Sequence, residues 1–179
     1  MTSESKFDEF VNSQKQNSRP DSVARLEQWR QDLKGLYEQV QGFLKKYVDK
    51  EQITCSFKEI EINEEYLGAY KIKSLSIQIG PKTITLTPIG AGVIGARGRV
   101  DLAGPAGKAR LVLVGKEATG PNTGEQRIVD CKPKDLDYVA SQKEPEQWAW
   151  KFATHPPRIE YLELNAKSLY QAIMEVANG

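Results

Sequence analysis

The sequence has few of the side chains from which most metal and redox sites are built. It contains two cysteines, Cys55 and Cys131, and one histidine, His155, which stands before two prolines. A single histidine excludes a histidine-rich zinc site, and two cysteines are too few for a disulfide framework. The Walker A, GxSxG and CxxC motifs are also missing. We therefore expect neither a resident metal nor a cofactor.

The chain also has little net charge and no long apolar run. Its formal net charge of +1 gives no overall attraction to nucleic acid or to anionic lipid. The longest aliphatic run is Leu111–Val114, whereas a membrane-spanning helix needs about 20 apolar residues. Residues 1–6 lack the basic and apolar pattern of a secretory signal. We expect a cytoplasmic protein without a membrane segment, in which nucleic-acid binding is left open only through a local basic patch.

The length of 179 residues fits one domain with its own core, which we place at residues 21–179. Residues 1–20 are mostly polar and are interpreted as a separate N-terminal segment, able to form one short helix that docks on the domain. The apolar residues of this segment are Phe7, Phe10 and Val11. Because Pro20 disfavours helical backbone at the residue before it, we expect the main helix to span residues 21–49.

Apolar residues recur at helical spacing through residues 21–49. They are Leu26, Trp29, Leu33, Leu36, Val40, Phe43 and Tyr47, and Tyr37 and Leu44 widen the stripe. A stripe of this width is typical of a helix that lies on a sheet, whereas a narrow seam suits a two-stranded coiled coil. We expect the helix to cover the sheet of its own chain, and dimerisation through it is the alternative.

Residues 53–164 are interpreted as an antiparallel sheet of about six strands, joined as a meander of hairpins. The alternation of apolar residues changes phase near Lys58 and again before Leu75, which predicts a bulge or a strong twist. A terminal helix is expected over residues 165–178, with Asn165 as its N-cap. The predicted fold is α+β, a bent antiparallel sheet packed by a long N-terminal helix and a short C-terminal helix.

The glycine-rich stretch at residues 90–114 contains a GxGxxG match that runs from Gly90 to Gly95. In a dinucleotide-binding unit this motif follows a strand and opens a helix, whose N-terminus meets the pyrophosphate. Residues 97–102 instead alternate as a strand. We therefore interpret these glycines as a sharply bent connection between two strands.

The same stretch predicts a hairpin with one basic face. The turn at Gly104–Gly107 sets a register in which Asp101 lies opposite Arg110. The basic residues expected on one face are Arg97, Arg99, Lys108 and Arg110. Arginine forks bind phosphate oxygens, and glycine-rich backbone nearby supplies amide donors. A solvated face with a cross-strand pair between Asp101 and Arg110 is the simpler interpretation.

Asp101, together with Asp130-Cys-Lys132, resembles the metal site of the PD-(D/E)xK nucleases. In that family such carboxylates hold Mg²⁺, and the lysine orients or activates a water molecule. The resemblance implies that Asp101, Asp130 and Lys132 converge, the last two from a short strand at residues 127–131. In this sequence the strand expected at residues 108–114, which has no carboxylate, stands between the two elements.

We favour a non-enzymatic function, that of a cytosolic protein which binds a macromolecular partner or itself. The expected contact surfaces are the hairpin of residues 90–114, through its four basic residues, and the helix of residues 21–49. A metal-dependent nuclease or phosphate-ester hydrolase that uses Asp101, Asp130 and Lys132 is the alternative.

Overall fold

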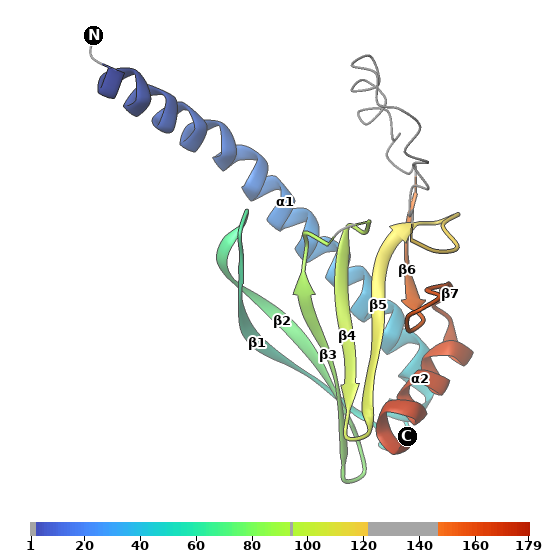
Figure 1. Cartoon of the computed structure of the whole chain (residues 1–179). Helices are drawn as coiled ribbons and strands as arrows, with labels where there is room; N and C mark the ends of the chain where they lie inside the picture. The colour runs from blue at the N-terminus through green and yellow to red at the C-terminus, as the bar shows by residue number, and fades with distance from the viewer. Residues whose placement is uncertain (1–2, 94, 122–146) are drawn as a thin grey trace, which may run out of the picture.

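A computed structural model describes residues 3–93, 95–121 and 147–179 and, within them, all side chains except those of residues 3–4 and 13–20. The elements are α1 (Ser3–Val48), β1 (Thr54–Glu64), β2 (Gly68–Ile79), β3 (Lys82–Gly90), β4 (Gly98–Gly104), β5 (Gly107–Gly115), β6 (Trp148–Ala153), β7 (Tyr161–Glu163) and α2 (Ala166–Asn178). In the described residues, seven strands form one antiparallel sheet in sequence order, and α1 and α2 share a core with it (Figure 1). The predicted α+β fold is confirmed, with seven strands where about six were expected.

Helix α1 has one part that packs on the sheet and another that projects beyond it (Figure 1). The buried side chains of the first part are Trp29, Leu33, Leu36, Tyr37, Val40 and Leu44. The helix therefore covers the sheet of its own chain, as its apolar stripe predicts. Residues 3–23, which we call the arm, extend away from the sheet, and helical backbone continues through Pro20. The helix begins at Ser3 rather than at residue 21, because the loss at a proline, about 3 kcal/mol, weakens a helix locally without having to end it.

Strands β1 and β2 form a long ribbon whose buried side changes along its length. The two strands pair in one unbroken register, from Thr54 with Gln78 to Glu64 with Gly68. Near one end of β2, Leu75 and Ile77 are buried, and near the other end Tyr70 and Ile72 are buried. The two pairs are separated by an odd number of positions, and successive side chains of a strand point to opposite faces. The ribbon must therefore twist between the pairs for both to be buried. The change of phase seen in the sequence is thus a twist, and a bulge between these two strands is the wrong alternative.

The β4–β5 hairpin has the register that its turn predicts, with Asp101 opposite Arg110. Its apolar face carries Val100, Leu102, Leu111 and Leu113, which are buried in the core. The glycine-rich connection from β3 leads directly into β4, and Gly95 has a positive φ of 78° in this turn. A bent connection between strands, rather than the start of a helix, is therefore confirmed for the GxGxxG match.

Helix α2 closes the core at one end of the sheet. Asn165 accepts a hydrogen bond from the Ser168 amide at 3.0 Å, and the Ser168 hydroxyl accepts one from the Asn165 amide at 3.0 Å. This reciprocal capping box confirms Asn165 as the N-cap. The Tyr170 hydroxyl then donates to the Phe43 carbonyl at 2.6 Å, which ties α2 to α1.

Residues 122–146 lie outside the described part of the chain. The short strand expected at residues 127–131 falls in this range, and so do Asp130, Cys131 and Lys132. Among the residues that the structure does describe, no helix combines the length and the apolar character that crossing a membrane requires.

Candidate functional site

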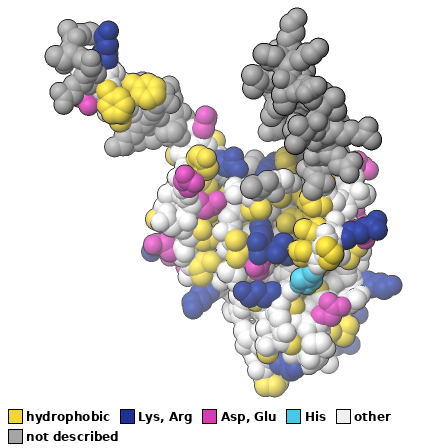
Figure 2. Space-filling view, in the orientation of Figure 1, with side chains coloured by type: hydrophobic (Ala, Val, Ile, Leu, Met, Phe, Trp, Pro, Cys, Tyr) yellow, Lys and Arg dark blue, Asp and Glu magenta, His cyan; other side chains and the backbone are white. Residues whose placement is uncertain are grey.

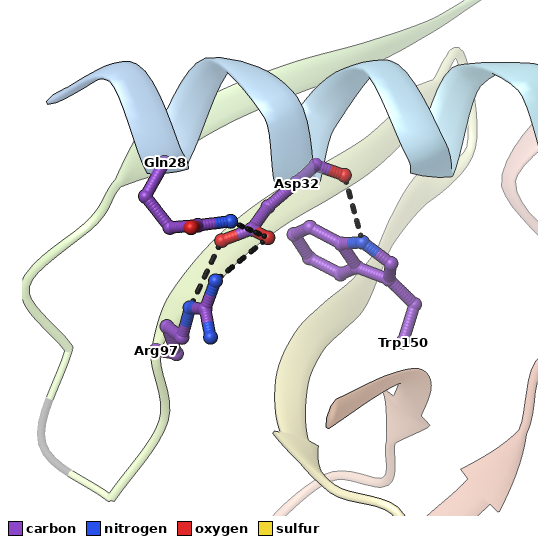
Figure 3. Close-up of polar contacts among 4 residues, drawn as sticks. All are labelled: Gln28, Asp32, Arg97 and Trp150. Carbon is purple, nitrogen blue, oxygen red and sulfur yellow. Dashed lines mark hydrogen bonds and ion pairs between the residues drawn. The ribbon is translucent and has the colours of Figure 1, made fainter. Parts of the chain in front are cut away.

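The four basic residues expected on one face of the hairpin do not lie together. Arg97 precedes β4 and turns toward α1, where its Nε and Nη2 each donate to the Asp32 carboxylate at 3.0 Å (Figure 3). Gln28 donates to the same carboxylate at 3.0 Å. Arg99 and Arg110 point instead to the sheet face opposite the helices. The residues that alternate with them along the strands, such as Val100, are in the core, and successive side chains of a strand point to opposite faces. The charge of Arg97 is therefore engaged inside the protein.

The contacts of Arg97 and Asp32 connect three elements. The Trp150 indole on β6 donates from Nε1 to the Asp32 carbonyl at 3.1 Å (Figure 3). The Arg97 guanidinium also lies 5.1 Å from the centroid of the Trp148 ring, within cation–π range. These contacts attach α1 to the start of β4 and to β6. The Arg97–Asp32 pair therefore has a structural role.

Arg99 is also paired, but within its own strand. Its Nε donates to Asp101 Oδ1 at 2.8 Å and its Nη2 to Oδ2 at 3.0 Å. The register places Asp101 opposite Arg110 as predicted, yet the two-bond pair forms with Arg99. Residues two apart in a strand share a face, and the planar guanidinium matches both carboxylate oxygens. The simpler interpretation, in which Asp101 pairs with Arg110, is wrong in its choice of partner.

Lys108 and Arg110 are the two basic residues of the hairpin that form no ion pair with another described residue. Lys108 is exposed at the turn and Arg110 is half-buried. Figure 2 shows Lys and Arg side chains with acidic groups among them on the side of the sheet turned away from α1. Binding through the four basic residues stays a prediction, with two of their charges already neutralised.

Of the three residues that resemble a nuclease site, Asp101 alone lies in the described part of the chain. Both oxygens of its carboxylate accept hydrogen bonds from Arg99, and its side chain is 10% exposed. Within the described residues, no group of three or more His, Cys, Asp or Glu side chains is placed to hold a metal ion. Asp130 and Lys132 are outside that part, so the resemblance stays a prediction.

The glycine turn after β3 binds a carboxylate that the sequence did not predict. The Ala91 amide donates to Oε1 of Glu64, the last residue of β1, and the Gly92 amide donates to Oε2, each at 3.0 Å. The Tyr70 hydroxyl donates to the same carboxylate. Burial raises the pKa of Tyr70, and its hydrogen bond to Glu64 raises it further. Backbone donors expected to suit a phosphate thus hold a carboxylate of the chain itself.

The arm carries an apolar stripe outside the core. Phe7, Phe10 and Val11 are 64%, 57% and 44% exposed. They are spaced i, i+3 and i+4, which places them on one side of the helix, and the two phenylalanine rings lie 6.5 Å apart. Figure 2 shows hydrophobic side chains on the projecting arm. The expectation that these residues dock the segment on its own domain is wrong, because the continuous helix carries them beyond the sheet.

Sequence reasoning missed two carboxylates, Asp32 and Glu64. Asp32 lies beside Trp29 and Leu33 in the buried stripe of α1, and a carboxylate among core positions is a signal for an internal cation. Glu64 offers no such signal, because β1 has other glutamates and its partners lie on a distant turn.

The ion pair of Arg97 with Asp32 and the hydrogen bonds of Glu64 to the glycine turn connect the elements of the folded part beyond the arm, which we call the body. The apolar stripe of the arm stays exposed. No protein-family model matches this chain, and no curated protein or solved structure does so either.

Proposed function

We propose that this is a non-enzymatic cytosolic binding protein whose main contact surface is the arm. The observation that carries the proposal is the exposure of Phe7, Phe10 and Val11 on a helix that projects from the body (Figures 1 and 2). Exposed apolar groups that lie together mark interaction sites more often than single exposed ones do. The neighbouring Lys6, Asp8 and Glu9 are also exposed and give the stripe a polar surround.

The occupant of this stripe is a partner protein with an apolar groove. Anchors at i, i+3 and i+4 are the pattern by which an amphipathic helix lies in such a groove. Most helical stability in proteins comes from packing, which the projecting arm does not receive from the sheet, and the arm contains weak helix formers such as Asn12 and Pro20. Burial of Phe7 and Phe10 by a partner would offset that instability.

The size of the stripe argues against pairing with a second arm. A fully buried aromatic side chain removes about 150–250 Å² from water, so two phenylalanines and a valine bury well under about 800 Å² per copy. A stable interface needs about that much on each side. A groove surrounds a helix on more than one side and therefore buries more of the same arm.

The β4–β5 hairpin supplies a second, smaller contact. Lys108 and Arg110 carry charges that no other described residue neutralises by an ion pair. Charges at the rim of an interface chiefly raise the association rate and depend on salt. Their contribution to binding is therefore expected to fall as the ionic strength rises.

A photoreactive phenylalanine analogue placed at position 7 in the full-length protein tests the arm in living cells. The expected result is one discrete crosslinked partner, which is lost when Phe10→Ser is added. The control places the analogue at Glu9, two residues along and on another side of the helix. Identical products from both positions, or a product that survives Phe10→Ser, would show that the stripe is not the contact.

Light scattering on the purified protein decides between a partner and a second copy. We expect a monomer for the wild type and for the Phe7→Ser, Phe10→Ser double variant. A wild-type dimer that becomes a monomer in the double variant would replace the groove with self-association through the arm.

A further inference from the structure

The turn at residues 90–92 is shaped around a carboxylate. The amides of two consecutive residues, Ala91 and Gly92, each reach one oxygen of Glu64 at 3.0 Å. A Cβ atom at Gly90 would lie 2.9 Å from Glu64 Oε2, closer than side-chain carbons approach a neighbour. With the Tyr70 hydroxyl as a third donor, the site has neutral donors for both oxygens of one planar anion.

The element that delivers Glu64 is weakly supported. Strand β3 pairs with β2 only from Leu75 to Ile79, so in the described residues the far half of the β1–β2 ribbon has no third strand. A two-stranded ribbon is only marginally stable by itself. Its tip is exposed, and Tyr66 in the connection is 85% exposed. Tyr70 and Ile72, further along β2, are buried in the core, so the release concerns the tip at residues 64–69 and not the rest of the ribbon.

The site is also open to a ligand from solution. Gly92 is exposed, so one of the two amide donors lies at the surface. Arg25, an exposed residue of α1, donates from Nη2 to the Ala91 carbonyl at 3.1 Å. Arg30, five residues further along, is exposed as well and donates to the Lys71 carbonyl of the ribbon. The guanidinium group of Arg25 at the turn and that of Arg30 beside the ribbon favour the approach of an anion.

We propose that the turn at residues 90–92 is a carboxylate-binding site that exchanges Glu64 for the carboxylate of a partner and thereby releases the β1–β2 tip. Two adjacent amides match the two oxygens of a carboxylate, and the carboxylate of Glu64 already occupies both of them. The site is separate from the arm, so the failure of either proposal leaves the other standing.

The test titrates the full-length Glu64→Ala variant with sodium acetate at constant ionic strength, with the amide signals of Ala91 and Gly92 followed by NMR. We expect a saturable shift of these two signals. The wild type should need at least about tenfold more acetate for the same shift, because Glu64 competes at a high effective concentration. The control, Glu65→Ala, changes the next glutamate, which is exposed, and should behave as the wild type does.

Two outcomes would overturn the proposal. One is a Glu64→Ala protein whose β4–β5 amide signals are native but whose Ala91 and Gly92 signals do not respond to acetate. The other is saturation by inorganic phosphate without saturation by acetate, which would assign the turn to a different anion.

A second variant keeps the test valid if the tip of Glu64→Ala collapses onto the turn. Glu64→Gln keeps the length of the side chain but replaces the anion with a neutral amide that has one acceptor oxygen, so it competes less strongly for the two backbone donors. Its acetate half-saturation should fall several-fold below that of the wild type, and hydrogen exchange at residues 64–69 should speed up. An acetate response identical to that of the wild type would contradict exchange at this site.

Discussion

Arg97 and Asp32, which are 65 positions apart in the chain, form a two-bond ion pair with both donor–acceptor distances at 3.0 Å. The pair lies at the boundary of the core, with side chains 28% and 13% exposed. The carbonyl of the same Asp32 accepts from Trp150, so one helical residue contacts the start of β4 and the middle of β6. Arg97, which the sequence predicted to face a ligand, therefore helps to attach α1 to the sheet.

Asp32→Asn should lower the free energy of unfolding by about 1–3 kcal/mol, because it leaves a half-buried guanidinium without its counter-charge. Urea denaturation of the variant and the wild type measures this difference. Glu38→Gln is the matched control, since it breaks an exposed pair with Lys34 whose side chains are 69% and 66% exposed. That change should cost less than about 0.5 kcal/mol. Equal effects of the two substitutions would remove the structural role of the Arg97 pair.

Local signals in the sequence predicted the parts of the fold that depend on neighbouring residues. The turn at Gly104–Gly107 determined the β4–β5 register, because the length of a hairpin connection sets the pairing of its strands. Asn165 and Ser168 likewise form a cap within four consecutive residues. The stripe of α1 identified its buried side, since helical spacing alone decides which residues share a face.

The candidate site was harder to predict because its partners are distant in sequence. Strand alternation would place Arg97 with Arg99, but Arg97 lies before β4 begins and is free to turn toward Asp32. Gly98 allows this arrangement by leaving room for Trp29 against the strand. The ligand of the glycine turn was hidden for the same reason, since Glu64 comes from another hairpin.

Gly98→Ala should destabilise the protein by about 1–3 kcal/mol or more, because the added methyl group has no space. Its Cβ would lie 2.2 Å from Cζ3 of Trp29, a side chain that is 1% exposed. Gly42→Ala is the control of opposite sign, since nothing lies within 4 Å of a Cβ there. In the interior of α1 it should stabilise by up to about 1 kcal/mol. Thermal unfolding of both variants checks the two signs, and a neutral Gly98→Ala would mean that Trp29 does not fill this position.

Asn165→Ala should cost about 1 kcal/mol, because it removes one half of the capping box at the start of α2. The Ser168 amide loses its acceptor, and no other acceptor for it is present in the described residues. Helix α2 covers the core with Leu169 and Ile173, so the loss should appear in global unfolding rather than as local fraying. A lower midpoint in urea with an unchanged slope is the expected observation. Asn165→Asp, which retains an acceptor, should restore most of the stability.

Tyr37 should make the protein sensitive to alkaline pH. Burial raises the pKa of its hydroxyl above the ordinary value near 10, so the folded state holds this proton more tightly than the unfolded state does. The resulting stability is complete below about pH 10 and is lost as the pH rises above it, at up to about 1.4 kcal/mol per pH unit. Tyr37→Phe should reduce this slope.

The same substitution should cost about 1 kcal/mol at neutral pH, through the lost 2.6 Å hydrogen bond from the Tyr37 hydroxyl to the Lys73 carbonyl. Urea denaturation between about pH 8 and pH 11 measures both effects. Tyr66→Phe removes a hydroxyl from a side chain that is 85% exposed and should leave stability at neutral pH unchanged. If Tyr37→Phe loses stability above pH 10 as steeply as the wild type, the alkaline loss has another origin, and Tyr70, whose pKa burial also raises, becomes the residue to replace next.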